Sequence, residues 1–172
     1  SELASILGIN KYCTPLQYFT KKRNEIECAA AGVEIEEAQS DECLWGHLHE
    51  PLIAEQFAAA TGCKVDPDSA GDWLAVYNAN PILRVSPDRL FIDRETGEIC
   101  NLEIKTVENE MIAKAEDLHL SWFIQVQYQM YVLGLTTTYI AVLCKGCHLR
   151  YFKIPYNAEI AEDAIKKGLE FW

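Results

Sequence analysis

The sequence predicts an α/β fold with a central mixed β-sheet flanked by helices. Segments with helical spacing of apolar residues and segments with strand character follow one another in the order helices, strands, helix, strands, helix. Residues 85–105 have the pattern of a β-hairpin, and no repeat, low-complexity tract or linker divides the chain. Because 172 residues, 49% of them apolar, suffice for one sizeable core, we expect a single domain over residues 1–172.

The N-terminal third is predicted to be helical. Residues 1–7 favour a short helix that stops at Gly8. Thr14 followed by Pro15 is an N-cap with proline in the first helical position, and the helix that it starts is expected to end at residue 21 or 22. A third helix is expected over residues 40–61, because apolar side chains recur every three or four positions: Leu44, Leu48, Leu52, Ile53, Phe57 and Ala60.

The remaining elements are predicted from alternation and turn residues. Three short strands are expected to lead into the hairpin and to form an antiparallel meander with it: residues 63–65, 73–77 and 82–85. The polar segment 107–118 indicates a loop or short helix beside the site. After it we expect a helix over 121–133, strands over 138–143 and 148–154, and a closing helix over 158–172.

The hairpin carries the candidate chemistry. Glu103 and Lys105 are two residues apart on a predicted strand and therefore share a face, while Cys100, Leu102 and Ile104 point to the core. Asp88, on the partner strand, can reach the same place. Two converging carboxylates suit a hard divalent cation, and an adjacent ammonium can orient or activate a water. A Pro-Asp turn and a solvated stripe explain the same residues, and the hairpin alone leaves both interpretations open.

Two further polar residues lie on predicted helices. Glu50 shares a helix face with Gly46, where the missing side chain leaves room for a close approach. His47 and His49 lie about 200° apart around that helix and cannot share one metal ion. Gln125 lies in an apolar helix, where burial without a partner would cost on the order of 1–3 kcal/mol, so we expect it to bind a phosphate, a metal-bound water or a catalytic side chain. For Gln127, a solvent-exposed position at the edge of the helix explains the residue as well as a specific partner does.

Cysteine usage and hydropathy indicate a cytoplasmic protein. The seven cysteines are an odd number in apolar surroundings, which favours reduced thiols. Cys144 and Cys147 flank a Lys-Gly hairpin turn, and no second CxxC is present to complete a zinc ribbon. No run approaches the roughly 20 apolar residues of a membrane span, and the first residues lack the basic start of a signal peptide.

The net charge of −11 argues at first against a polyanionic substrate. However, seven of the 26 acidic residues lie between Glu25 and Glu42, a segment without a basic residue, which leaves 19 acids against 15 bases elsewhere. We expect much of the excess to form one local face, either solvated or docked to a partner. Metal at the acidic site would neutralise more of it.

Five segments occur in an order that resembles one known family: Ser1 to Gly8 with Thr14-Pro15-Leu16, Gly46 to Pro51, Ser86-Pro87-Asp88, Leu102-Glu103-Ile104-Lys105, and Gln125-Val126-Gln127-Tyr128. The chain resembles the YqaJ-type viral recombinases, the phage lambda exonuclease family, within the PD-(D/E)XK nucleases. This resemblance covers nearly the whole chain. It implies a restriction-endonuclease-like PD-(D/E)XK core.

The resemblance also implies a function. The expected enzyme is a Mg²⁺- or Mn²⁺-dependent DNA exonuclease that binds the ends of double-stranded DNA and degrades one strand from the 5′ end, leaving a 3′ overhang. Family members act as ring-shaped trimers, and a single-strand annealing protein is a possible partner. By the same resemblance the protein would be encoded by a phage or prophage and would work in the cytoplasm of a bacterial host.

Residue roles carry over position by position. Asp88, Glu103 and the carbonyl of Ile104 would ligate the metal, and Glu50 would complete the site through metal or water. Lys105 would activate or orient the attacking water, and Gln125 would position water or a terminal phosphate. The residues expected to contact substrate phosphate are Ser1, Ser86 and Arg89, the last standing where many members have glycine.

Two other functions remain open at this level. An endonuclease, or a nuclease specific for single strands or flaps, would share the same motifs. A DNA-binding subunit without catalysis is disfavoured, because it would have no chemical need for Asp88, Glu103 and Lys105 together.

Overall fold

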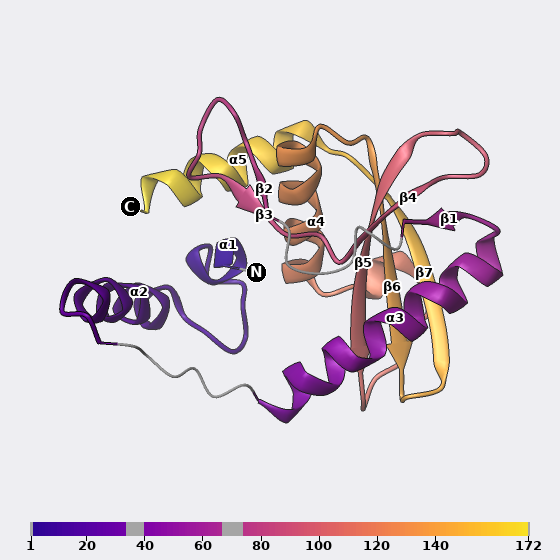
Figure 1. Cartoon of the computed structure of the whole chain (residues 1–172), viewed down its shortest axis with the longest axis horizontal. Coiled ribbons are helices and arrows are strands. Elements are labelled where there is room, and N and C mark those ends of the chain that lie inside the picture. The colour runs from indigo at the N-terminus through magenta and orange to yellow at the C-terminus, as the bar shows by residue number, and fades with distance from the viewer. Residues whose placement is uncertain (1, 34–39, 67–73, 172) are drawn as a thin grey trace.

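The main sheet of the protein has five strands in the order β1-β4-β5-β6-β7 (Figure 1). The computed structural model describes residues 2–33, 40–66 and 74–171. The strands of this sheet are β1 (Lys64–Val65), β4 (Arg89–Ile92), β5 (Ile99–Val107), β6 (Thr137–Cys144) and β7 (His148–Pro155). Since β5 and β6 are parallel and the other neighbours antiparallel, the sheet is mixed, as predicted.

The predicted antiparallel meander is wrong. The strands β2 (Ala75–Val76) and β3 (Arg84–Val85) pair with each other in a separate two-stranded sheet, so they do not lead into the hairpin as its neighbours. The chain leaves β5 and returns to β6 through a helix, and such a crossover makes the two strands parallel. The predicted strand over 73–77 lies in part outside the described residues, which begin again at residue 74.

Five helices surround these sheets among the described residues: α1 (Glu2–Ile6), α2 (Pro15–Ala30), α3 (Asp41–Thr61), α4 (Leu120–Leu133) and α5 (Ala158–Glu170). The predicted cap of α2 is confirmed, because the Thr14 hydroxyl accepts the Gln17 amide while the Gln17 side chain accepts the Thr14 amide. The predicted cap of α3 by Gly62, at φ 71°, is confirmed as well.

The helix α2 extends to Ala30, well beyond its predicted end at residue 21 or 22. Ion pairs one turn apart cross that point: Lys22 contacts Glu25 at 2.9 Å, and Arg23 contacts Glu27 at 2.9 Å. These pairs also show that part of the predicted acidic face is balanced by basic residues that precede it. Three members of that face lie outside the described residues: Glu34, Glu36 and Glu37.

Both faces of the main sheet are covered, and this positions the site. The helix α3 packs on one face, where Phe57 contacts the buried Leu102 and Ile104 of β5. The opposite face lies against α4, whose Val126 and Met130 are fully buried. The core orientation predicted for Cys100, Leu102 and Ile104 is therefore confirmed, while the other face of β5, with Glu103, is enclosed under α4.

The helix α3 departs in part from the predicted core pattern. Leu44, Leu48 and Leu52 are 44%, 58% and 54% exposed, whereas Ile53 and Phe57 are buried. The helix meets the core through Ile53, Ala54 and Phe57, so helical periodicity alone misassigned the three leucines to the core.

The turn between β6 and β7 agrees with the prediction. Lys145 and Gly146 have φ angles of 53° and 70°, both in the left-handed region, and the Cys147 amide donates to the carbonyl of Cys144 at 3.2 Å across the turn. All seven cysteines are free, but only Cys100 and Cys144 are buried, and Cys43 and Cys147 are exposed, so the expected apolar surroundings are not found at every cysteine. Across residues 2–33, 40–66 and 74–171, no helix is long and apolar enough to cross a membrane.

Candidate active site

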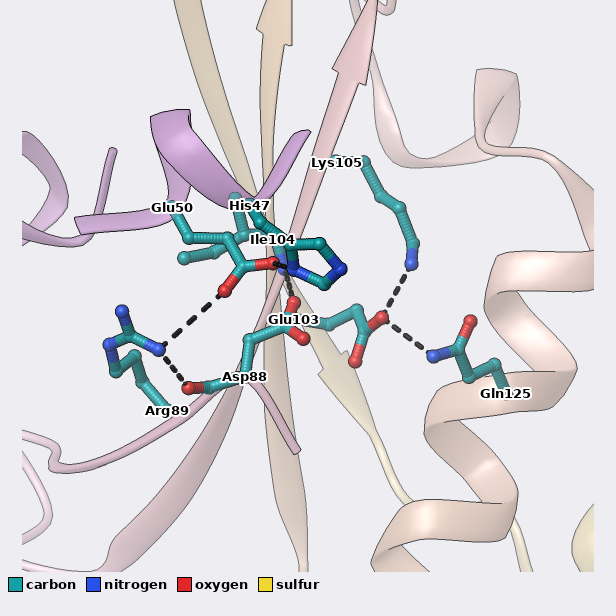
Figure 2. Close-up of polar contacts among 8 residues, drawn as sticks. All are labelled: His47, Glu50, Asp88, Arg89, Glu103, Ile104, Lys105 and Gln125. Carbon is teal, nitrogen blue, oxygen red and sulfur yellow. Dashed lines mark hydrogen bonds and ion pairs between the residues drawn. The ribbon is translucent and has the colours of Figure 1, made fainter. Parts of the chain in front are cut away.

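The strands β4 and β5 bring Asp88 next to the face that carries Glu103. Asp88 immediately precedes β4, whose first residue, Arg89, pairs with Leu102 of β5. A carboxylate oxygen of Asp88 accepts the backbone N–H of Ile104 at 2.6 Å. Figure 2 shows Asp88 and Glu103 side by side, with Asp88 bonded to Ile104, the residue that follows Glu103 on β5. The hairpin thus brings together the three residues that the sequence analysis proposed as metal ligands on these strands.

Glu103 is held by three side-chain donors. It is only 1% exposed. Its Oε1 accepts hydrogen bonds from Lys105 Nζ at 2.5 Å and from Gln125 Nε2 at 2.6 Å, as Figure 2 shows. Its Oε2 accepts one from Gln129 Nε2 at 2.7 Å. Of the partners expected for Gln125, the structure therefore shows a side chain, that of Glu103, which the sequence analysis proposed as catalytic.

Glu50 reaches the site from α3. Its Oε1 lies 2.9 Å from His47 Nδ1, and its Oε2 lies 3.7 Å from a guanidinium nitrogen of Arg89, which also donates to the backbone carbonyl of Asp88 (Figure 2). A side chain on Gly46 would meet no atom within 4 Å, so the helix is open at that point. His47 was not predicted as part of the site.

The placement of Arg89 differs from the expected phosphate contact. Arg89 is 7% exposed and its guanidinium faces Glu50, so it is directed into the protein. Its observed contacts join Glu50 to the segment that carries Asp88. Ser86 is exposed two residues before Asp88, and Ser1 lies outside the described residues. The phosphate-binding roles of Ser1, Ser86 and Arg89 remain predictions.

Negative charge dominates the electrostatics of the site. Burial, and next the nearby Glu103 carboxylate, raise the pKa of Asp88 well above its usual range, while Lys105 opposes the shift. Burial alone would lower the pKa of Lys105, but the carboxylates of Glu103 and Asp88 outweigh it and raise that pKa. Lys105 consequently remains an ammonium ion, and one ammonium does not offset the crowded carboxylates.

The donors present fit a hard divalent cation. Mg²⁺ and Mn²⁺ prefer oxygen ligands, and three carboxylates within electrostatic range of one another gain from an added positive charge. The three carboxylates are those of Asp88, Glu103 and Glu50, and the charges of Glu103 and Glu50 both raise the pKa of Asp88. Within the described residues, no three His, Cys, Asp or Glu side chains already stand in a metal-binding arrangement, since each carboxylate is turned to its own protein donors. The metal remains a prediction.

A groove of about 1450 Å³ runs along the site. Glu50, Lys105 and Gln125 line it, so side chains from α3, β5 and α4 face one space. Two tryptophan–histidine ring pairs also lie along its walls: Trp45 with His49 and His119 with Trp122. The charged residues Glu50 and Lys105 are therefore open to this groove.

Three side chains that follow Gln125 on α4 fix this helix in place, and the sequence analysis missed their contacts. Gln127 is fully buried, donates to the carbonyl of Pro155 at 2.9 Å and accepts the Asn157 amide at 2.7 Å, so the solvent-exposed interpretation is wrong. The Tyr128 hydroxyl bonds both the N–H and the carbonyl of Arg84, at 2.9 and 3.0 Å. Gln129 follows Gln125 by one turn, a spacing that could have identified it.

The chain matches the YqaJ-like viral recombinase domain over residues 1–139. It belongs to this family. The YqaJ protein of Bacillus subtilis (strain 168) is 30% identical over 176 residues, covering 100% of this chain and 51% of YqaJ. The chain thus spans about half the length of this curated relative.

Solved structures confirm the fold of this YqaJ-like chain. LHK-Exo, an alkaline exonuclease from Laribacter hongkongensis, superposes with a TM-score of 0.68 at 13% identity, over 98% of this chain and 84% of LHK-Exo. The complex of LHK-Exo with dAMP gives a TM-score of 0.71 at 15% identity, over 99% and 83%. The predicted nuclease fold, a central mixed sheet flanked by helices, is confirmed.

Proposed function

We propose that this chain is a Mg²⁺- or Mn²⁺-dependent DNA exonuclease that hydrolyses one strand of linear duplex DNA from its 5′ end and leaves a 3′ overhang. The observation that carries the proposal is the meeting of Asp88, Glu103 and Lys105 beside a groove. Membership of the YqaJ-like family and the likeness to an alkaline exonuclease support it. That LHK-Exo was crystallised with dAMP supports a nucleoside monophosphate as product.

The metal would be held by Asp88, Glu103, Glu50 and the carbonyl of Ile104. When bound, it would lower the pKa of a water and stabilise charge on the scissile phosphate. The carboxylate of Glu103 accepts hydrogen bonds from three side-chain donors, which hold it in place beside the proposed metal position. Lys105, as an ammonium with a raised pKa, would donate to the attacking water or to a phosphate oxygen.

We extend the proposal to assembly. A homotrimer is supported by exposed apolar side chains on two helices, since such surfaces commonly mark protein contacts. They are Leu16, Phe19 and Ile26 on α2 and Leu44, Trp45 and Leu48 on α3. Light scattering should give three times the chain mass of 19.5 kDa, and a monomer at micromolar concentration would contradict this part of the proposal. The single-strand annealing partner rests on the family alone.

Digestion of defined DNA substrates tests the activity. Linear duplexes with a 5′-phosphate or a 5′-hydroxyl, and a covalently closed circle, are incubated with Mg²⁺, with Mn²⁺ or with EDTA, and the products are separated by chromatography. We expect mononucleotides from linear DNA only, with metal only, and faster from the 5′-phosphorylated end. Nicking of the circle would replace the exonuclease with an endonuclease, and DNA binding without cleavage under any metal would indicate a binding subunit.

A further inference from the structure

Two buried amides lie directly beneath Glu103. Asn101 precedes Glu103 by two residues on β5 and therefore shares its face, and Gln129 approaches from α4. Asn101 Nδ2 donates to Gln129 Oε1 at 2.8 Å, and Gln129 Nε2 donates to Glu103 Oε2 at 2.7 Å. The two amides are 0% and 3% exposed, so neither can touch a substrate in the groove.

The chain of amides has a fixed direction. A glutamine amide has nearly the same shape in either orientation, and its partners decide which end faces which way. The carboxylate of Glu103 can only accept, so it selects the nitrogen end of Gln129 and leaves the Gln129 oxygen facing away from it. The NH₂ group of Asn101 donates to that oxygen. Asn101 therefore holds Gln129 in the orientation that Glu103 requires.

This arrangement is costly for a core. The Oδ1 atom of Asn101 is buried and accepts no hydrogen bond from any residue that the structure describes. A buried acceptor without a donor destabilises the folded state, and an apolar residue of similar size would avoid that loss. On this face of β6, Ile140 and Val142 are apolar, and the directly paired Thr138 is buried with a hydroxyl that also lacks a partner among the described residues. Packing alone does not account for an asparagine at position 101.

We propose that Asn101 and Gln129 are positioning residues that fix the carboxylate plane of Glu103 for metal binding. With Lys105 and Gln125 on Oε1 and Gln129 on Oε2, both oxygens are held and the carboxylate cannot rotate. Partners behind a ligand orient it, and their loss commonly weakens metal binding by about 10–100-fold. This inference rests on the proposed function, because it assigns a purpose to the orientation of a proposed ligand.

The same helix and sheet supply matched controls. Gln129→Met removes the donor to Glu103, and Gln127→Met removes two equally buried hydrogen bonds that lead away from the site, to Pro155 and Asn157. Asn101→Leu removes the donor to Gln129. Its control is Thr138→Val, which changes the residue paired with Asn101 across the sheet, a buried threonine whose hydroxyl has no partner among the described residues. The two variants of each pair change similarly buried positions, but only one of them alters the hydrogen bonds that lead to Glu103.

The test measures Mn²⁺ binding by calorimetry on metal-free protein, with urea unfolding to follow stability. We expect Gln129→Met to weaken Mn²⁺ binding by about 10-fold or more, and Asn101→Leu to weaken it in the same direction. Gln127→Met and Thr138→Val should bind Mn²⁺ as the wild type does, whatever stability they lose. Equal Mn²⁺ affinity in Gln129→Met and wild type, or an equal loss in Gln127→Met, would overturn the proposal.

A second readout needs no metal. In nitrogen–proton NMR spectra, the side-chain amide of Gln129 should shift in Asn101→Leu and in Glu103→Gln and remain in place in Thr138→Val. If the Gln129 amide signal stays in place in both Asn101→Leu and Glu103→Gln, the hydrogen-bonded chain from Asn101 through Gln129 to Glu103 does not exist. Failure of the proposed function is distinguishable, because it would appear as a wild-type protein that neither binds Mn²⁺ nor cleaves DNA.

Discussion

Two buried carboxylate sites, separated by the strand β4, differ in how their charge is compensated. Asp93, at the end of β4, is 2% exposed; its Oδ1 accepts the amides of Glu95 and Thr96, and its Oδ2 accepts Tyr139 and Lys153, each at 3.1 Å. The Glu95 amide, together with its other donors, lowers the pKa of Asp93 against the effect of burial. The single carboxylate of this site therefore accepts hydrogen bonds at both of its oxygens.

Asp88, at the other end of β4, has the opposite electrostatics. It accepts the amide of Ile104, but burial and the carboxylate of Glu103 raise its pKa. Burial is the largest cause of the raised pKa of Asp88, whereas hydrogen-bond donors outweigh burial at Asp93. The difference is whether the surrounding donors already balance the charge, because only an unbalanced group of acids gains from binding a cation.

The largest expected effect separates the lysines of the two sites. Lys105→Ala should lower the rate of DNA cleavage by about 10²–10⁴-fold, the usual contribution of a positioned proton donor, and leave folding and DNA binding nearly intact. The matched variant Lys153→Ala removes the lysine that contacts Asp93 at 3.1 Å and should leave the rate unchanged. Single-turnover cleavage measures both. Intact turnover by Lys105→Ala would contradict the assigned site.

A second variant, at Asp93, should lower the stability of the protein and leave metal binding unchanged. Asp93→Ala leaves the amides of Glu95 and Thr96 without their acceptor and should destabilise the protein by about 1–3 kcal/mol, measured by urea unfolding. Mn²⁺ affinity should not change, because Asp93 takes no part in the proposed metal site. A variant as stable as the wild type, or one that loses Mn²⁺ binding, would remove the distinction between the two sites.

The sequence was sufficient for what local patterns determine. Alternation on one strand placed Glu103 and Lys105 on one face, and a lysine followed by glycine predicted the hairpin turn at 145–146. Both depend on residues close together in the chain. The hairpin predicted that Asp88, which immediately precedes β4, would meet Glu103 and Lys105, while the roles of Glu50 and Gln125 came from the family resemblance.

Tertiary packing determined the rest. The parallel pairing of β5 and β6 depends on where α4 crosses, and the donors of Gln129 and Asn101 depend on how α4 lies over β5. Arg89 turned inward because its partner, Glu50, lies on α3, far away in the sequence. No spacing within one segment carries that information.

A third prediction concerns the stability that the metal-free protein loses because the carboxylates of Asp88 and Glu103 lie close together. In metal-free protein near neutral pH, Asp88→Asn should raise the melting temperature by a few degrees, because the neutral amide keeps an acceptor for Ile104 and removes a carboxylate that is crowded by Glu103. Cleavage should be lost. Adding Mn²⁺ should stabilise the wild type and have little effect on this variant. A lower melting temperature in the metal-free variant would show that Asp88 is a structural acid like Asp93.

The smallest effect is a difference in the slope of stability against pH. Asp93 has a lowered pKa, so its contribution to stability is complete above the unfolded pKa of about 3.9 and is lost as the pH falls through the lower folded value. Asp88 has a raised pKa, so it destabilises the metal-free protein as the pH rises from about 3.9 through the higher folded value. Urea unfolding across the acid range should therefore give a flatter acid loss in Asp93→Asn and a flatter decline toward neutral pH in Asp88→Asn. If both variants flattened the same part of the curve, the two carboxylates would share one electrostatic environment, and the division between a balanced and an unbalanced site would fail.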